Sequence, residues 1–265
     1  MWPGRDAGAG AGTGRIRLPR AAFDLLMKRV RGGGERGDLG HLDDLDIRMD
    51  GGGELPALRA AAAALREPVC TMILRLQDAD GRRQVHEGWI DGRTAVILLA
   101  DAGDQGDEAA LCELAAVHPD FLPEAVARIT RLGPRRGPAA VVPLRLRLPE
   151  IEELTSPDPA DRAAAVERLA AAGLSENACN GARSLATGLV GRWELMLRWT
   201  PAPGSAGRRG IHVIDSDAGL WLLEPAGSDL LAWPVTATAI WRLLIRSLPG
   251  DDELGSGAAA GPRRR

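Results

Sequence analysis

The stretch that decides the fold runs from Thr71 to Leu99 and reads TMILRLQDADGRRQVHEGWIDGRTAVILL. Residues 72, 74 and 76 are apolar and alternate with Ile73, Arg75 and Gln77, which is the period of a β-strand with one buried face. The tetrapeptide Asp-Ala-Asp-Gly at residues 78–81 predicts a tight turn, residues 85–90 return as a second strand, and an Asp-Gly turn leads into a third strand over residues 94–99. The stretch therefore predicts an antiparallel meander.

A second stretch repeats this pattern about 123–126 residues further along the chain. Its strands are predicted over residues 194–199, 211–214 and 220–223, and its turns over residues 201–207 and 215–219. His86 and His212 hold equivalent positions, and each meander is followed by a helix opened by proline, at Pro123 and at Pro234. Similar hairpins can arise independently, because aliphatic strands resemble one another. The shared order favours a duplication, in which two copies pair into one pseudo-twofold antiparallel sheet with helices on one face and at the ends.

The rest of the chain is predicted to add outer strands and helices to the two meanders, which makes the fold α+β. Strands are expected over residues 15–19 and 140–148, with a weak one at residues 45–47 in a glycine-rich loop over residues 32–53. Helices are expected over residues 23–30, 55–66, 108–116 and 123–132, from Pro159 to Gly173, from Ser175 to Gly188, and from Pro234 to Pro249. The half-repeats then cover residues 15–133 and 134–250, intertwined in one domain between disordered tails at residues 1–14 and 251–265.

Composition excludes several classes of protein. The 265 residues carry a net charge of −3, which supplies no basic excess for binding nucleic acid through counterion release. The longest clean apolar run, residues 95–100, is much shorter than the roughly 18 residues that a membrane span needs. Three well-separated cysteines argue against a disulfide framework, and the first residues do not have the pattern of a signal sequence. We therefore expect a cytoplasmic protein without a membrane span and without a nucleic-acid partner.

No catalytic residue, metal site or cofactor is predicted. None of the four histidines lies three to five residues from another His or Cys, so no metal-ligand pair is present locally. A metal or proton site at His86 and His212 is the alternative to a shared polar strand face, which explains both residues more simply. Six residues separate Cys112 from His118, which would put them on opposite sides of a helix and argues against a nucleophile–base pair. All three cysteines are interpreted as small core residues, and the glycine-rich segment at residues 32–37 as a loop.

Tryptophan is concentrated in the second half of the chain, at Trp199, Trp221, Trp233 and Trp241. Since the chain has only two phenylalanines, most of these rings are expected in the core. Trp233 immediately precedes Pro234 and has a second interpretation, as an exposed anchor for a partner at a helix end.

The order and length of these elements resemble the EspG family, the cytosolic chaperones of type VII (ESX) secretion systems, over most of residues 15–249. The resemblance rests on the opening strand and helix, the first meander, and four short stretches. These stretches are Leu55–Pro68, Gly191-Arg192-Trp193, Arg209-Gly210-Ile211, and Asp215–Gly219 followed by Leu220–Pro225. The resemblance implies a pseudo-twofold fold with a central antiparallel sheet flanked by two helical bundles. It also implies that the protein is not an enzyme but a carrier, which binds the helical tip of PE/PPE-type substrates and keeps them soluble for export.

The same resemblance implies a binding surface at the loop of the first hairpin and at the C-terminal helical bundle. Carried onto this chain, and with Trp233 added as the exposed anchor, the partner-binding residues are Gln77, Asp78, Asp80, Arg82, Val166, Leu169, Leu174, Leu185 and Trp233. The short hairpin tip and the absence of tyrosine depart from the family pattern. Alternatives are a non-catalytic adaptor for another cytosolic protein, or a small-ligand-binding protein that uses the sheet face around Arg75, Arg198, His86 and His212. We expect a monomer or a weak homodimer, which would associate through exposed strand edges.

Overall fold

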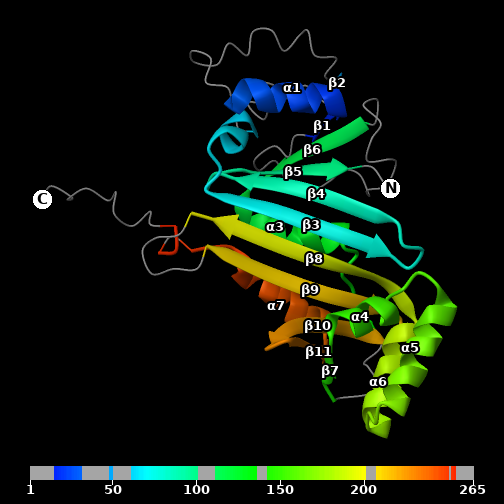
Figure 1. The fold of residues 1–265 in the computed structure, drawn as a ribbon. Helices are drawn as coiled ribbons and strands as arrows, with labels where there is room; N and C mark the ends of the chain where they lie inside the picture. Colours follow the sequence, from blue (N-terminus) through cyan, green and yellow to red (C-terminus); the bar gives the residue numbers. More distant parts are fainter. Residues whose placement is uncertain are drawn as a thin grey trace, which may run out of the picture. The chain divides into compact units, whose positions relative to one another are not determined.

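The computed structural model describes residues 15–31, 48–49, 61–100, 111–135, 142–200, 207–250 and 252–254. Antiparallel strands and helices follow one another in runs along these residues, with β3 to β6 and β8 to β11 as the two longest runs of strands, as predicted for an α+β fold (Figure 1). The chain forms two compact units, unit 1 (Met1–Thr71 and Glu87–Leu122) and unit 2 (Met72–His86 and Pro123–Arg265). The predicted tail at residues 1–14 and the predicted weak strand at residues 45–47 lie outside the described residues. So do most of the C-terminal tail and of the loop over residues 32–53.

Unit 1 is a small antiparallel sheet that carries a helix. Its elements are β1 (Arg15–Pro19), α1 (Arg20–Arg31), β2 (Arg48–Met49), helical residues 61–66, the second half of β4 (Arg83–Ile90), β5 (Ala95–Ala100), β6 (Leu111–Val117) and the short 3-10 helix η3 (Pro119–Phe121). The strands lie in the order β2-β1-β6-β5-β4, and Leu98 of β5 is paired with Leu114 of β6. Phe23 of α1 packs on Trp89 of β4 with ring centroids 5.8 Å apart. One apolar cluster thus joins α1, the residue 61–66 helix and the sheet.

The helix predicted over residues 108–116 is wrong, because Leu111–Val117 forms strand β6 between β1 and β5. The Ala and Glu residues of this segment favour a helix in isolation, but pairing on both sides with neighbouring strands outweighs a preference of a few tenths of a kcal/mol per residue. Cys112, Leu114 and Ala116 are buried and alternate with less buried residues, which is the strand period. Cys112 therefore lies in β6, and His118 follows this strand as the cap of η3, so the two residues do not belong to one helix as predicted.

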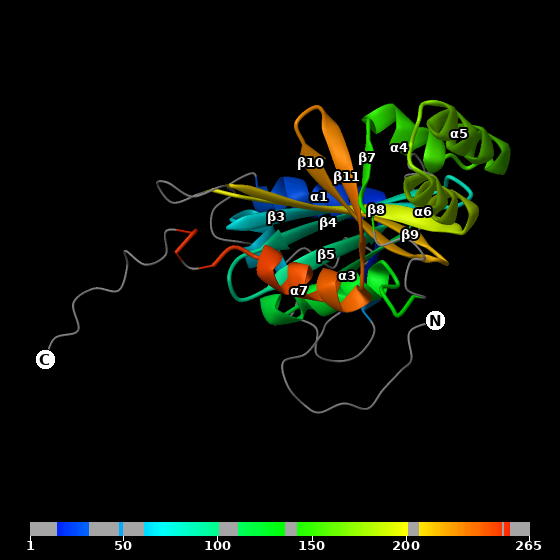
Figure 2. The same cartoon turned by 90° about the horizontal axis from the view of Figure 1, so that it is seen from below.

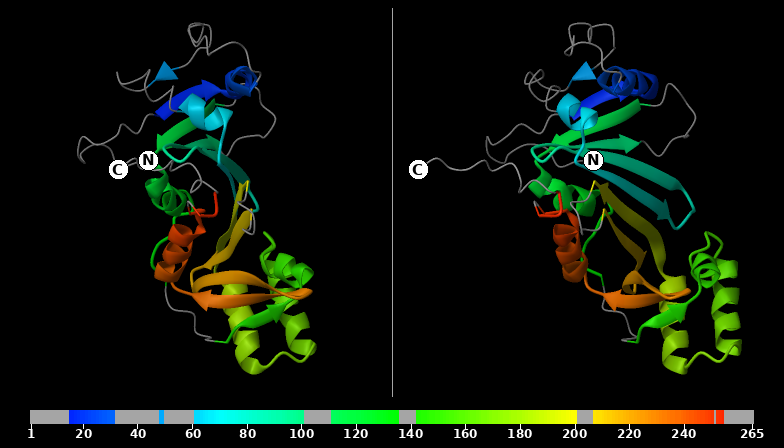
Figure 3. Two further views of the ribbon diagram at one scale, coloured as in Figure 1. Left: turned by 90° about the vertical axis from the view of Figure 1, so that its left-hand side faces the viewer. Right: turned by 60° about the vertical axis from the view of Figure 1, so that its left-hand side comes forward.

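Unit 2 contains the second meander and most of the helices. Its strands are the first half of β4, β3 (Cys70–Asp78), β8 (Leu189–Trp199), β9 (Arg208–Ser216), β10 (Gly219–Ala226), β11 (Asp229–Val235) and β7 (Leu144–Leu146), and they neighbour one another in this order. Its helices are α3 (Leu122–Ile129), α4 (Leu148–Leu154), α5 (Pro159–Ala171), α6 (Glu176–Thr187) and α7 (Ala237–Ser247). Within this unit, α4–α6 and α7 lie on opposite sides of the strands (Figures 2 and 3).

The caps predicted for α5 and α6 are confirmed. The Asp158 carboxylate accepts a hydrogen bond from the Ala160 amide at the start of α5, and the Ser175 hydroxyl accepts one from the Ala178 amide at the start of α6. Gly173 follows α5 with φ +90°, a left-handed conformation that favours glycine. The apolar sides of α4, α5 and α6 pack on Ile214 and Trp221 of the sheet to form the core of this end of unit 2.

Two predicted boundaries in the second half are wrong. Pro234 does not open a helix: it lies in β11, and α7 begins after Thr236, whose hydroxyl accepts a hydrogen bond from the Ala239 amide. The strand predicted over residues 140–148 is reduced to β7, since Leu148 already opens α4, a helix that the sequence analysis did not predict. The cause in both cases is a proline, which fits an outer strand or the first turn of a helix equally well.

Both halves of the chain have the same order of elements around their meanders. In the first half the meander continues into a fourth strand, β6, whose other edge pairs with β1; in the second half it continues into β11, whose other edge pairs with β7. This order agrees with a repeat, and the duplication itself stays a prediction. The division into residues 15–133 and 134–250 also stays a prediction.

Candidate functional site

The tip of the β3–β4 hairpin is a tight turn held by one carboxylate. Asp78 Oδ1 accepts hydrogen bonds from the amides of Asp80 (3.0 Å) and Arg82 (2.8 Å), and the Asp78 amide donates to the Arg82 carbonyl (3.0 Å). Gly81 has φ +82°, which a side chain would strain. An Asx turn of this kind fixes the backbone locally, so the tip is a rigid projection with exposed charges at Asp80 and Arg82.

This tip lies directly against the loop between α4 and α5. A Cβ atom on Gly81 would come within 2.6 Å of Pro157 Cγ. On the other side of β3, the Ala79 amide donates to the Val190 carbonyl (3.1 Å), and a Cβ on Gly191 would lie 2.5 Å from the Gln77 carbonyl oxygen. Gly81 therefore lets the hairpin approach the α4–α5 loop closely, and Gly191 lets β8 approach β3.

Arg192 on β8 connects the hairpin to α4. Its guanidinium donates from Nε (3.1 Å) and Nη2 (2.9 Å) to Gln77 Oε1, and from Nη1 (3.3 Å) to the Thr155 hydroxyl at the end of α4. Burial lowers the pKa of this guanidinium from its usual value. Further along the same two strands Arg75 pairs with Glu194 (3.3 Å), and the sequence order of these pairs shows that β3 and β8 run antiparallel.

Arg162, which is only 9% exposed, holds α4, α5 and α6 together from inside. Its Nε donates to the Ala186 carbonyl (2.8 Å) near the end of α6, and its Nη1 donates to the Ser156 (2.6 Å) and Pro157 (3.0 Å) carbonyls of the α4–α5 loop. These carbonyls lie in the last turn of α6 and in the loop between α4 and α5, where a carbonyl cannot bond to an amide of its own helix, and a buried carbonyl without a donor is costly. One side chain thus satisfies both the C-terminal end of α6 and the loop that contacts the hairpin tip.

An open groove of about 480 Å³ runs between α5 and α6. Its lining includes Ala163, Val166 and Ala170 from α5 and Ala186 from α6, with Glu167 and Arg183 at the more polar positions. Small side chains on both helices leave room for apolar side chains of another polypeptide. The two charged residues supply opposite signs that would orient such a ligand.

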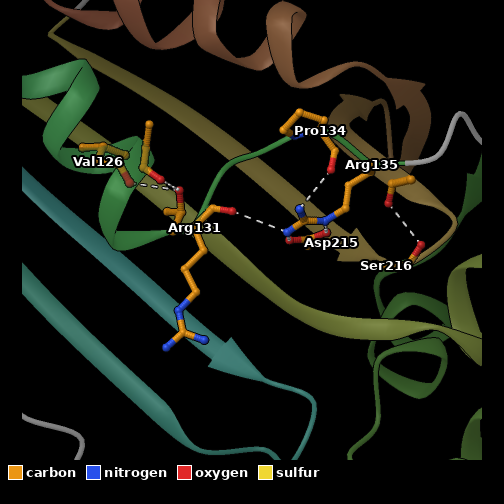
Figure 4. Close-up of polar contacts among 9 residues, drawn as sticks. Val126, Arg131, Pro134, Arg135, Asp215 and Ser216 are labelled. Atoms are coloured by element: carbon orange, nitrogen blue, oxygen red, sulfur yellow. Dashed lines mark hydrogen bonds and ion pairs between the residues drawn. The ribbon is translucent and has the colours of Figure 1, made fainter. Parts of the chain in front are cut away.

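The loop after α3 anchors the sheet that carries these helices (Figure 4). Arg135 donates from Nε (2.8 Å) and Nη2 (2.7 Å) to the two carboxylate oxygens of Asp215 on β9, which is 4% exposed. This bidentate hydrogen bonding raises the pKa of Arg135. Two residues beyond Asp215, the Asp217 amide donates to the Gly188 carbonyl (2.7 Å) at the end of α6. The end of β9 is therefore tied both to the loop after α3 and to the helical end.

The predicted partner-binding residues fall into three groups. The first group lies together at the hairpin tip, beside the α4–α5 loop, and consists of Gln77, Asp78, Asp80 and Arg82. Val166, Leu169 and Leu185 are 7%, 5% and 0% exposed and belong to the core under the helices, while Leu174 is partly buried against it. Leu169 and Leu185 would therefore hold the two helices in place, whereas a partner would contact the exposed residues of α5 and α6 and the part of Val166 that lines the groove.

Trp233, the ninth of these residues, lies on β11 and is 38% exposed. Among the other tryptophans, Trp199 and Trp221 are core residues, as predicted, whereas Trp241 is 36% exposed on α7. Arg162 and Arg192 both organise the site, and neither was predicted as a site residue. Neither has a local signal, since their partners lie up to 24 and 115 residues away along the chain.

The titratable side chains that the sequence analysis considered for other chemistry lie apart in the structure. No group of three or more His, Cys, Asp or Glu side chains there is placed to hold a metal ion. The three cysteines are buried, as predicted for core residues. His86 is buried in β4, and this burial lowers its pKa to about 4. His212 lies on an exposed strand face, with its Nε2 atom 3.2 Å from Glu194 Oε1. The groove lies between α5 and α6 and not at these histidines. None of the described helices is long and apolar enough to cross a membrane.

The architecture is thus a mixed fold in which helices pack on antiparallel strands. The chain matches the structure of the Mycobacterium tuberculosis type VII secretion system chaperone EspG5 in complex with a PE25–PPE41 dimer. The match covers 89% of this chain and 97% of the other, with a TM-score of 0.52 and 12% sequence identity. No protein-family model and no curated protein matches the sequence. The resemblance to the EspG family is therefore confirmed at the level of the fold.

Proposed function

We propose that this protein is a cytoplasmic chaperone of a type VII secretion system, which binds the helical tip of a PE/PPE-type substrate and keeps it soluble before export. The observation that carries the proposal is a fold shared with EspG5 over nearly the full length of both chains. The EspG5 structure contains a bound PE25–PPE41 dimer, so this fold is able to hold a partner of that kind.

The proposed binding surface is the helical end of unit 2, made of the hairpin tip at residues 77–82 and the groove between α5 and α6. The groove offers small apolar side chains, which suit the apolar residues at the tip of a helical hairpin. The rigid turn at Asp78 adds fixed charges at one border of the surface. No bond is made or broken in this function, so the surface needs only shape and charge.

Such binding would act by mass action. An exposed apolar tip on a secreted helical protein promotes self-association. A chaperone that covers the tip lowers the concentration of free substrate with an exposed tip. The chaperone must then release its substrate. An interface with a small apolar centre and a charged border is suited to this, because standard-sized interfaces span a wide range of affinity.

Co-expression with a PE–PPE pair from the same genome, followed by size-exclusion chromatography with light scattering, tests the proposal. We expect a complex of one copy of each chain. Ala170→Trp fills the groove from an exposed position and should abolish co-elution, whereas Ala171→Trp, next to it on α5 and outside the groove lining, should leave the complex intact. Failure of the wild-type protein to co-elute with any such pair, with all chains folded, would contradict the proposed function. Equal loss in both variants would contradict the proposed surface.

A further inference from the structure

Helix α7 presents a second exposed surface on the side of unit 2 away from α4–α6 (Figures 2 and 3). Its inner side is buried, with Ile240 at 0% and Leu244 at 1% exposure. Its outer side carries Trp241 (36% exposed) and Ile245 (52% exposed), two of the large apolar side chains that are exposed to solvent among the described residues. Because they are four residues apart, the two side chains form one row along the helix.

A second row of the same helix is basic. Arg242 and Arg246 are exposed, lie four residues apart and directly follow the two apolar residues. Among the described residues neither side chain forms an ion pair or a hydrogen bond, and α7 contains no acidic residue. Like charges at this spacing repel each other, and no acidic residue of α7 offsets the repulsion.

The helix is held firmly at both ends, so this surface is preorganised. The Thr236 hydroxyl caps the first turn, and Arg209 Nη1 donates to the carbonyls of Arg246 (3.0 Å), Ser247 (3.3 Å) and Leu248 (3.1 Å) at the last turn. The Arg209 guanidinium is itself fixed by Glu253 (2.6 Å). A rigid element loses little conformational entropy on binding, which favours its use as an interface.

We propose that α7 is a docking site for an acidic amphipathic helix of a second protein, distinct from the substrate bound at the helical end. Such a helix has aliphatic residues four apart and a neighbouring row of Glu or Asp, and its spacing of about 6 Å matches both rows of α7. Tryptophan and arginine are the side chains most often found at the energetic centres of interfaces. The acidic row would pair with Arg242 and Arg246, while the aliphatic row would cover Trp241 and Ile245.

A second copy of this chain fits the surface poorly. Two α7 helices packed against each other would bring four guanidinium groups together in a poorly solvated interface, with no carboxylate from α7 to compensate. An anionic membrane is the other surface that a basic, tryptophan-containing helix can bind. Only one tryptophan and one isoleucine are offered on α7, which is a small apolar area for insertion into lipid, and this favours the protein partner.

The test uses the full-length protein and two labelled helical peptides in fluorescence anisotropy. One peptide carries Leu at positions i and i+4 and Glu at i+1 and i+5 over three heptads; the other has Lys in place of Glu. We expect saturable binding of the Glu peptide alone, a loss of about tenfold or more in affinity for Trp241→Ala, and a reversed preference for Arg242→Glu/Arg246→Glu. The control pair Arg66→Glu/Arg93→Glu makes the same charge change at exposed positions of unit 1 and should bind as the wild type does.

Three outcomes would overturn the proposal. The first is equal binding of both peptides, or of neither, by a folded protein. The second is a Trp241-dependent dimer in light scattering, which would assign α7 to a second copy of the chain. The third is Trp241-dependent binding to phosphatidylglycerol vesicles without binding of the Glu peptide, which would assign it to a membrane. Since Trp241→Ala leaves the groove untouched, co-elution with a PE–PPE pair should persist in this variant, and the two proposals can fail separately.

Discussion

Replacing Arg162 by methionine should loosen the helical end of unit 2 more than any other single arginine substitution on α5 or α6. Methionine keeps most of the aliphatic volume, so the change chiefly removes the guanidinium. Three hydrogen bonds are lost, to the carbonyls of Ala186, Ser156 and Pro157. Because these acceptors lie around a side chain that is 9% exposed, water cannot readily replace the donor.

The expected cost follows from these contacts. A hydrogen bond from a charged donor contributes about 1.5–3 kcal/mol, and a buried acceptor without a donor costs about 1–3 kcal/mol. The three bonds share one guanidinium, so their contributions do not add, and part of the cost is offset because the charge of Arg162 no longer has to be desolvated. We expect a loss of about 3–4 kcal/mol in the free energy of unfolding, measured by urea denaturation, with an unchanged m-value.

The matched control is Arg168→Met on the same helix. Arg168 is mostly exposed and pairs with Glu153 at 2.7 Å, and exposed ion pairs typically contribute less than about 1 kcal/mol. Urea midpoints for the two variants that differ by less than the fitting error would refute the assignment of Arg162 as the residue that joins α4, α5 and α6. Hydrogen exchange should further show faster exchange at residues 156–187 in Arg162→Met alone.

Three further predictions concern the sheet of unit 2. Burial holds the pKa of His86 at about 4, below the usual 6.5, so the unfolded chain takes up the proton first. The contribution of neutral His86 to the free energy of unfolding is therefore fully present above about pH 6.5, and it falls by about 1.4 kcal/mol per pH unit down to about pH 4. Thermal melts of His86→Met should lack this slope, while those of His212→Gln keep it. A double-mutant cycle between Arg135 and Asp215 should give a coupling energy of about 2–3 kcal/mol by urea denaturation, and a value near zero would contradict the role of this pair. Gly191→Ala should cost about 1–3 kcal/mol and accelerate exchange at the hairpin tip, because its Cβ would lie 2.5 Å from a backbone oxygen; an unchanged exchange rate would show that β3 and β8 are less closely packed.

The strands of both meanders could be predicted because each combines a period of two with turn residues at its ends. The predicted turn at residues 78–81 is confirmed, with Asp78 and Gly81 in the roles that their chemistry suggests. Strand β6 could not be predicted in the same way. Its Ala and Glu residues carry the preferences of a helix, and only its two neighbouring strands turn it into part of a sheet.

Helices α5 and α6, which form the groove of the candidate site, could be predicted, and the roles of their side chains could not. The helices around Val166 and Leu185 have apolar residues at helical spacing, which indicates that one side is buried but does not tell core from interface. The structure buries both residues, although Val166 also borders the groove, where its neighbours are smaller or more polar. Arg162 and Arg192 have no pattern at all in the sequence, because their partners meet them only after folding.

The arrangement of unit 2 suggests how one protein could serve two partners at once. The helical end and α7 lie on opposite sides of the same strands, so that a substrate at the groove leaves α7 accessible. Under our two proposals, α7 would recruit a second component while the substrate stays bound. Each surface can be removed without the other, by Ala170→Trp and by Trp241→Ala.

Hydrogen exchange on the purified complex with a PE–PPE pair, followed by mass spectrometry, tests the central claim most directly. We predict slower exchange at residues 77–82 and 159–187 on complex formation, and no change at residues 237–247. Slower exchange confined to other segments, or an unchanged pattern in a stable complex, would contradict a substrate site at the helical end of unit 2.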